Sequence, residues 1–107
     1  MQHLSTIELA VWLADSSRTQ PLLLDVREPW EYETCHIQGS QLISMSSIPM
    51  RQEELDPEKP IVCICHHGAR SMQVAAFLER AGFENITNLT GGIHDWALQV
   101  DNNMPTY

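Results

Sequence analysis

The chain has 107 residues, a length that suits one domain with one hydrophobic core. Hydrophobic residues make up 43% and charged residues 19%, a composition that excludes a disordered chain. Fourteen Asp and Glu residues against six Lys and Arg residues give a formal net charge of -8, so we expect no binding to nucleic acid or to an anionic membrane. A small anionic ligand would have to be attracted by local dipoles or positive charges.

The cellular compartment can also be inferred. No run approaches the ~20 apolar residues of a membrane span, and the first five residues lack the basic and apolar parts of a signal peptide. The cysteines are Cys35, Cys63 and Cys65, an odd number that does not suit a disulfide framework. We therefore expect one domain over residues 1–107, located in the reducing cytoplasm, where free thiols persist.

In chain order, short β-rich runs alternate with amphipathic stretches. Ser5 and Glu8 have the spacing of a capping box, and Pro29 suits the first turn of a short helix. The patterns predict helices over residues 6–15, 29–33, 70–81 and from 91 onward, a poor helix over 47–55, and strands over 22–26, 41–43, 61–65 and 85–89. This alternation predicts an α/β domain with a mainly parallel sheet, whose ligands bind at the carboxyl ends of the strands.

The loop after the most apolar strand combines features that favour a reactive cysteine. Cys65 ends the strand, and Gly68 permits a tight turn whose backbone N–H groups face inward. The following helix directs its positive end to the same place, and Arg70, with His66 and His67, adds positive character. Such a cradle favours the thiolate and would equally hold a small oxyanion. We therefore interpret Cys65 as a nucleophile and not as an ordinary core cysteine.

The other cysteine and histidine residues receive structural interpretations. Cys63 lies inside the strand with apolar neighbours, so we expect it to pack in the core. The C-x-C-H-H run has no second ligand pair at zinc spacing, because Cys35 and His36 are adjacent and His94 stands alone. We therefore expect no metal site.

The length of the loop separates two chemistries. From Cys65 to Arg70 the loop has six residues. Cysteine phosphatases use a loop that is one residue longer, because it must encircle a tetrahedral phosphate. A tighter loop suits a smaller target, such as a sulfur atom carried on the cysteine.

Three segments together resemble the rhodanese family of sulfurtransferases in its single-domain form. Residues 24–39 are similar to the family's D-V-R-E-P-x-E-Y-x-x-G-H-I-x-G segment, residues 65–71 to its C-x-x-G-x-R-S active loop, and residues 89–96 to its L-x-G-G-x-x-x-W ending. The three motifs occur in the family's order and cover nearly the whole chain, which makes the match specific.

The resemblance implies a five-stranded, mainly parallel sheet flanked by helices on both faces. It also implies that Cys65 takes a sulfane sulfur from a donor and passes it to a nucleophilic acceptor. The persulfide would be held by the loop amides of His66, His67, Gly68, Ala69 and Arg70, and Arg70 aligns with the family's loop arginine.

Two positions depart from the family pattern. Cys35 stands where the family usually has Gly, so we do not expect a backbone conformation that requires glycine at this position. The substitution also places an additional thiol in a segment that we expect to be exposed. Glu31 stands where the two-domain thiosulfate sulfurtransferases carry a basic residue, which weakens the case for thiosulfate as the physiological donor.

The remaining conspicuous side chains are expected to be structural. Asp25 and Arg27 are interpreted as a buried pair, and His36 as a structural or capping histidine. We expect packing roles for Trp12, Trp30 and Trp96, and a solvated face for Glu53, Glu54, Asp56 and Glu58.

The sequence thus predicts a sulfurtransferase that works by a ping-pong mechanism through a persulfide on Cys65. Its partners would be a small anionic donor such as thiosulfate and a thiol, a protein thiol or cyanide as the acceptor, with no metal or organic cofactor. Two other classes stay open. One is a phosphatase or arsenate reductase of the related fold, and the other is a sulfur carrier or partner-docking module without turnover.

Overall fold

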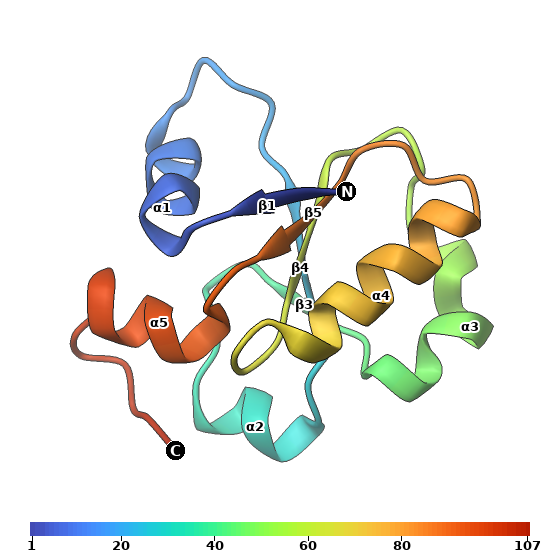
Figure 1. Cartoon of the computed structure of the whole chain (residues 1–107). Helices are drawn as coiled ribbons and strands as arrows, with labels where there is room; N and C mark the ends of the chain where they lie inside the picture. The colour runs from blue at the N-terminus through green and yellow to red at the C-terminus, as the bar shows by residue number, and fades with distance from the viewer.

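The computed structural model describes residues 1–107 and contains a parallel sheet with helices on both sides (Figure 1). The strand order is β1-β5-β4-β2-β3, and every neighbouring pair is parallel. The strands are β1 (Gln2–Leu4), β2 (Leu22–Asp25), β3 (Gln41–Leu42), β4 (Ile61–Ile64) and β5 (Ile86–Leu89). Because all strands run the same way, their carboxyl ends meet at one edge, and Cys65 directly follows the central strand β4.

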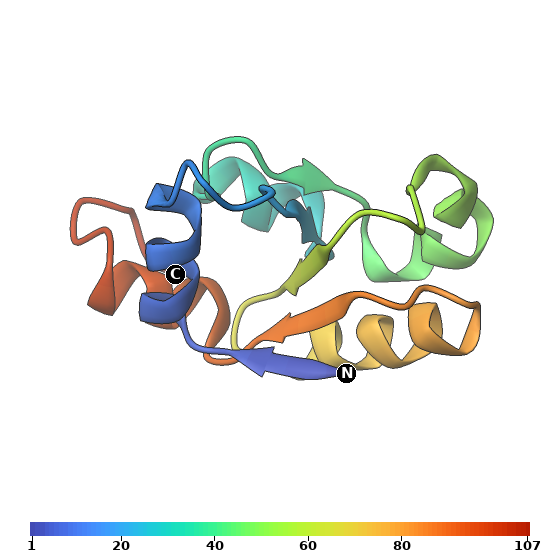
Figure 2. The ribbon, with the colours of Figure 1, turned by 90° about the horizontal axis from the view of Figure 1, so that it is seen from above.

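The helices cover the two faces of the sheet. They are α1 (Thr6–Ala14), α2 (Pro29–Thr34), α3 (Ile48–Arg51), α4 (Ala69–Arg80) and α5 (Gly92–Gln99), and the 3-10 turns η1 (Met45–Ser47) and η2 (Gln52–Glu54) flank α3. Figures 1 and 2 show α1 and α5 on one side of the sheet and α3 and α4 on the other. None of the helices combines the length and apolar character that a membrane crossing requires.

The alternation of side chains along β4 divides the core into two clusters. Cys63 packs with the α4 residues Val74 and Leu78, whereas Val62 and Ile64 pack on the side of α1 and α5. All four residues of β4 are buried, so both faces of this strand are covered, as expected for a central parallel strand. Burial of each large apolar side chain contributes roughly 1.5–3 kcal/mol, so β4 is firmly held. The loop that follows it is therefore anchored to a rigid element.

The predicted capping box of α1 is confirmed, and the helix ends lie close to their predicted positions. Ser5 Oγ accepts from the Glu8 N–H at 3.1 Å, and the Ser5 N–H donates to Glu8 Oε1 at 2.9 Å, which completes the capping box of α1. α4 begins at Ala69, one residue earlier than predicted, and ends at Arg80, one residue earlier than predicted. The four strands predicted from apolar runs are all present, each within one or two residues of its expected bounds.

The edge strand β1 was not predicted from the residue pattern. Its three residues are mostly exposed and show no apolar run. They are extended because they pair with β5, where His3 faces Asn88 and Leu4 faces Leu89. The Thr90 N–H also donates to the Leu4 carbonyl oxygen at 2.9 Å. Such pairing is a tertiary contact, so a local pattern carries little sign of it.

Candidate active site

Cys65 lies beneath the loop that joins β4 to α4 and is 1% exposed. The N–H of Gly68 donates to Cys65 Sγ at 3.0 Å. Gly68 is the N-cap residue of α4 and has a φ of +114°, a conformation that L side chains rarely adopt. This glycine therefore lets the loop turn back over the sulfur, as the sequence predicted.

Four other amides of the same loop have no partner in the protein. The N–H groups of His66, His67, Ala69 and Arg70 donate neither to a backbone nor to a side-chain acceptor. Those at the start of α4 carry the partial positive charge of a helix N-terminus. All five predicted residues thus lie in this loop, where the Gly68 amide binds the sulfur and the four unpaired amides are suited to hold an extra sulfur or a small anion.

A second contact to the sulfur comes from the first turn of α4. Ser71 Oγ lies 3.3 Å from Cys65 Sγ, and either atom could be the donor. The Ser71 hydroxyl donates to Asn88 Oδ1 at 2.5 Å, which ties α4 to β5. Ser71 and Asn88 are both buried. Ser71 belongs to the recognised loop motif, but nothing in the local pattern around Asn88 indicated that it supports this serine.

The N-terminus of α5 packs directly against the loop. The N–H groups of Ile93 and His94 donate to the carbonyl oxygens of Cys65 and His66 at 2.9 and 3.0 Å. Gly92 has a φ of +60°, and a Cβ atom there would overlap these same two carbonyl oxygens. Gly92 is therefore explained by the close approach of α5 to the loop, whereas a Cβ atom at Gly91 would meet the Asp95 side chain of its own helix.

Arg70 forms an ion pair with Glu31 of α2. Its two terminal nitrogens donate to the two carboxylate oxygens of Glu31 at 2.7 and 2.9 Å. This bidentate pair lowers the pKa of Glu31 to about 2, chiefly through the hydrogen bonds from Arg70. The Arg70 side chain is therefore not free to bind a donor anion in this structure. Its charge is already neutralised by a carboxylate beside the loop.

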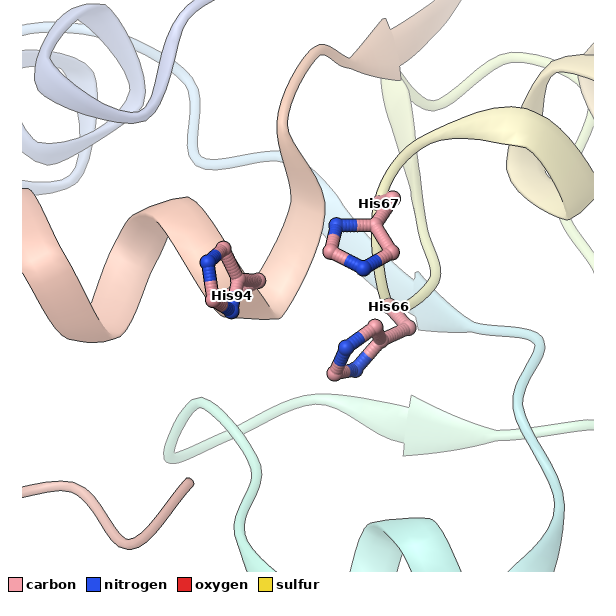
Figure 3. Close-up of side chains that lie close together, drawn as sticks. All are labelled: His66, His67 and His94. Atoms are coloured by element: carbon pink, nitrogen blue, oxygen red, sulfur yellow. The ribbon is translucent and has the colours of Figure 1, made fainter. Parts of the chain in front are cut away.

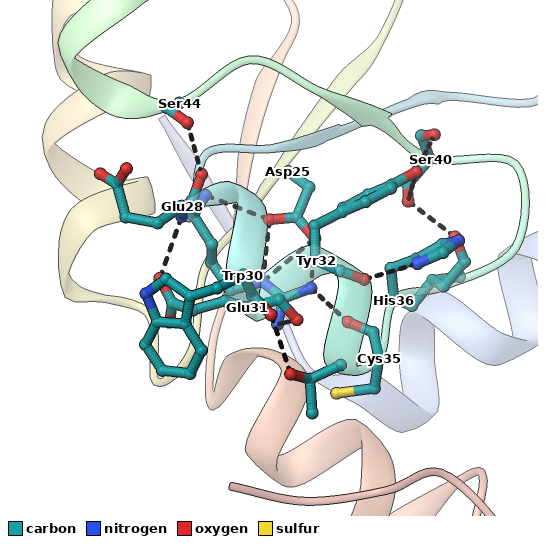
Figure 4. Close-up of polar contacts among 12 residues, drawn as sticks. Asp25, Glu28, Trp30, Glu31, Tyr32, Cys35, His36, Ser40 and Ser44 are labelled. Atoms are coloured by element: carbon teal, nitrogen blue, oxygen red, sulfur yellow. Dashed lines mark hydrogen bonds and ion pairs between the residues drawn. The ribbon is translucent and has the colours of Figure 1, made fainter.

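The C-terminal residue joins a second buried ion pair to this one. The Tyr107 hydroxyl donates to Glu31 Oε2 at 2.7 Å and accepts from Arg27 at 2.9 Å. Arg27 also pairs with Asp25 at 2.7 Å and donates to the Cys35 carbonyl oxygen at 2.7 Å. The side chains of Arg27 and Asp25 have no exposure to solvent. Figure 4 shows Asp25, Glu31 and Cys35 gathered around α2. The buried Asp25–Arg27 pair is confirmed.

Three histidines meet at the mouth of the loop. His66 and His67 come from the loop and His94 from the first turn of α5, and Figure 3 shows the three side chains close together. One nitrogen from each ring can be chosen so that all three lie within 4.8 Å of one another. The idea that His94 stands alone is therefore wrong, because tertiary packing brings it to the other two. Burial, followed by the neighbouring imidazoles, lowers the pKa of His66 below its ordinary value.

Several structural expectations can now be judged. Cys63 is fully buried, and burial raises the pKa of its thiol to about 12, which confirms a packing role. Cys35 was expected to be exposed, but it is buried, with only 6% of its surface exposed. Its φ of -167° is ordinary extended backbone, so the position does not require a glycine. Trp12 and Trp96 are buried as expected. Trp30 is not, because it is 59% exposed and lies edge-on against the ring of Tyr107.

The two remaining expectations are confirmed. His36 Nδ1 lies 2.8 Å from the Tyr32 carbonyl oxygen, and its ring stacks on the Tyr32 ring, which is a structural role at the end of α2. The acidic side chains of the segment after α3 are exposed, and they are Glu53, Glu54, Asp56 and Glu58.

Comparison with known proteins places the chain in a family. The model of the rhodanese-like domain matches residues 9–99. A relative from Arabidopsis thaliana, the Rhodanese-like/PpiC domain-containing protein 12, is 40% identical over 79% of this chain. The thiosulfate sulfurtransferase GlpE of Pseudoalteromonas translucida is 31% identical over 84% of this chain and 86% of its own length. The chain belongs to the rhodanese-like domain family.

A solved structure agrees with this assignment. A rhodanese-like domain protein from Staphylococcus aureus superposes with a TM-score of 0.83 at 30% identity, over 90% of this chain and 91% of the other. The five-stranded rhodanese-like fold expected from the resemblance is thus confirmed. Some curated relatives are much longer, and the chain spans 30% of the Arabidopsis protein and 26% of another relative.

Proposed function

We propose that this protein is a sulfurtransferase that carries a sulfane sulfur as a persulfide on Cys65. The observation that supports this most is the environment of the sulfur. Cys65 Sγ accepts a hydrogen bond from the Gly68 N–H at 3.0 Å. Four further amides of the same loop have no partner in the protein. Membership of the rhodanese-like family points to the same chemistry.

In the first step, the Cys65 thiolate attacks the outer sulfur of a donor such as thiosulfate. The new bond joins Sγ to that sulfur, and the S–S bond to the sulfite group breaks with its electron pair going to sulfite. The persulfide carries one negative charge, which the loop amides and the N-terminus of α4 stabilise. His66, His67, Gly68, Ala69 and Arg70 supply these amides, so their backbone and not their side chains would bind the transferred sulfur.

In the second step, an acceptor thiolate or cyanide attacks the outer sulfur of the persulfide. The S–S bond breaks, and its electron pair returns to Cys65 as thiolate. The Ser71 hydroxyl lies 3.3 Å from Sγ and can turn its proton from Asn88 toward the anionic sulfur. The acceptor would be a small thiol, a protein thiol or cyanide. The three cysteines are free, which suits a reducing compartment such as the cytoplasm.

The rival functions differ in what they require of the loop. A phosphatase or arsenate reductase would need room for a tetrahedral oxyanion. Here the loop from Cys65 to Arg70 has six residues, and the Gly68 N–H donates a hydrogen bond to Cys65 Sγ. A carrier without turnover would use the same persulfide, so only kinetics separate it from an enzyme.

The experiment is intact mass spectrometry after incubation with thiosulfate. We expect a gain of one sulfur atom, which cyanide removes with formation of thiocyanate. Cys65→Ser serves as the control and should gain nothing. An unchanged mass in the wild type, or an equal gain in Cys65→Ser, would overturn the proposal. Steady thiocyanate production over many turnovers identifies an enzyme, a single turnover identifies a carrier, and hydrolysis of an aryl phosphate identifies a phosphatase.

A further inference from the structure

The imidazole side chains of His66, His67 and His94 take no part in the proposed sulfur-transfer steps. These side chains come from two separate parts of the chain, the active loop and α5, and their convergence depends on the docking of α5 against the loop. The backbone bond from the His94 N–H to the His66 carbonyl oxygen, at 3.0 Å, holds the two segments in register. The cluster is therefore held in place by backbone hydrogen bonding between the loop and α5.

The geometry of the rings is close to that of a metal site. The ring centroids of His66 and His67 are 4.1 Å apart, those of His67 and His94 are 5.0 Å apart, and those of His66 and His94 are 5.7 Å apart. The candidate ligand nitrogens lie within 4.8 Å of one another. Tetrahedral zinc with Zn–N distances of about 2.0–2.1 Å separates its ligand nitrogens by ~3.3 Å. The three ligand nitrogens would therefore have to move closer together when a metal ion binds.

Two of the three rings carry an unused polar atom. The Nδ1 atoms of His66 and His94 are buried and form no hydrogen bond with any group of the protein. Buried polar atoms are nearly always paired, so two such atoms in one cluster point to a ligand. Imidazole is a good ligand for zinc and for related first-row metal ions. The chain's formal net charge of -8 also favours the approach of a cation.

We propose that His66, His67 and His94 form a three-imidazole binding site for a divalent metal ion of the zinc type. This reverses the expectation, drawn from spacing alone, that the chain has no metal site. Three protein ligands leave a fourth coordination position open, as in zinc sites that exchange ligands. The site depends on the folded packing of α5 on the loop, and it does not depend on the proposed sulfur transfer.

The test is binding of Zn²⁺ to the whole protein after treatment with a chelator, measured by calorimetry and by the rise in melting temperature. We expect one Zn²⁺ per chain and a higher melting temperature in its presence. His67→Gln and His94→Gln should each weaken binding by at least ~10-fold, the loss that even outer-shell changes cause. Co²⁺ provides a second readout, because three imidazoles around it should give visible absorption bands that both variants lose.

Matched variants keep the proposal falsifiable. His36→Gln removes an exposed imidazole that lies outside the cluster and should bind Zn²⁺ like the wild type. Cys65→Ser should also retain binding, because the proposed ligands are imidazoles. His67 is exposed, so His67→Gln tests the site even if His94→Gln fails to fold. Binding that survives both histidine substitutions, or that disappears in Cys65→Ser while it persists in His94→Gln, would overturn the proposal.

Discussion

Arg70 and Glu31 form a bidentate ion pair that joins the active loop to α2, with N–O distances of 2.7 and 2.9 Å. The Glu31 side chain is 5% exposed and that of Arg70 is 31% exposed, so the pair lies partly inside the protein. It has two consequences. It ties the first turn of α4 to α2, and it places a carboxylate beside the active loop.

The first prediction concerns this carboxylate. Glu31→Gln keeps the shape of the side chain but removes its negative charge, which leaves Arg70 with an uncompensated positive charge. We expect kcat/KM for thiosulfate to rise by about fivefold, or on the order of 1 kcal/mol for one charge near a partly exposed site. Glu33→Gln, which neutralises an exposed carboxylate on the same helix, is the control and should change little. A lower kcat/KM in Glu31→Gln would contradict the prediction.

Removal of the arginine should have the opposite effect. Arg70→Ala leaves the Glu31 carboxylate beside the loop without its cation, and we expect kcat/KM for thiosulfate to fall by about fivefold, which corresponds to a free energy on the order of 1 kcal/mol for one unpaired charge near a partly exposed site. If neutralisation of Glu31 is the main role of Arg70, the double variant Arg70→Ala/Glu31→Gln recovers most of this loss. Failure of the rescue would instead show that Arg70 contacts the donor.

The same pair should make the fold sensitive to acid. The folded protein lowers the pKa of Glu31 to about 2 from the ordinary value of 4.5. The stabilisation is therefore fully present above pH 4.5 and is lost as the pH falls from there to about 2. The difference in unfolding free energy between the wild type and Glu31→Gln should shrink over this range in urea denaturation. A difference that is constant with pH would refute the ion pair as its source.

Cys65 should be the only cysteine needed for sulfur transfer. Cys65→Ser should abolish thiocyanate formation, whereas Cys63→Ala and Cys35→Ala should keep most of it, because both side chains are buried and Cys63 stays a protonated thiol. Each alanine variant should lose some stability through the small cavity that it creates. Kinetics should therefore be measured well below the melting temperature of each variant. Full activity in Cys65→Ser would end this assignment.

Gly92→Ala should distort the active loop. The added methyl would overlap the carbonyl oxygens of Cys65 and His66, and these backbone atoms cannot rotate away as a side chain could. A φ of +60° would also strain any residue other than glycine. The control is Gly39→Ala, because Gly39 has a φ of +86° but no atom within 4 Å of an added Cβ. We expect Gly39→Ala to cost about 1–2 kcal/mol in stability with activity retained. Gly92→Ala should cost more and lose most of the activity, and equal effects of the two substitutions would contradict the close-packing explanation.

The sequence by itself determined most of the local structure and the reactive residue. The apolar runs, the capping box and the glycine of the loop act within a few residues, so they predict four strands, the main helices and the position of Cys65 at a strand end. Recognition of the family motifs added the fifth strand. These features follow from local backbone preferences and from the regular spacing of the apolar residues that become buried.

Only the tertiary structure decided which side chains meet. Arg70 and Glu31 are 39 residues apart and Tyr107 is 76 residues from Glu31, so no local pattern reveals their contacts. His94 joins His66 and His67 because Gly92 lets α5 approach the loop. Cys35 is buried because the end of α2 packs against the core on the side of α1 and α5. A side chain's partners depend on how whole elements dock, and this docking is set by the sum of many distant packing contacts.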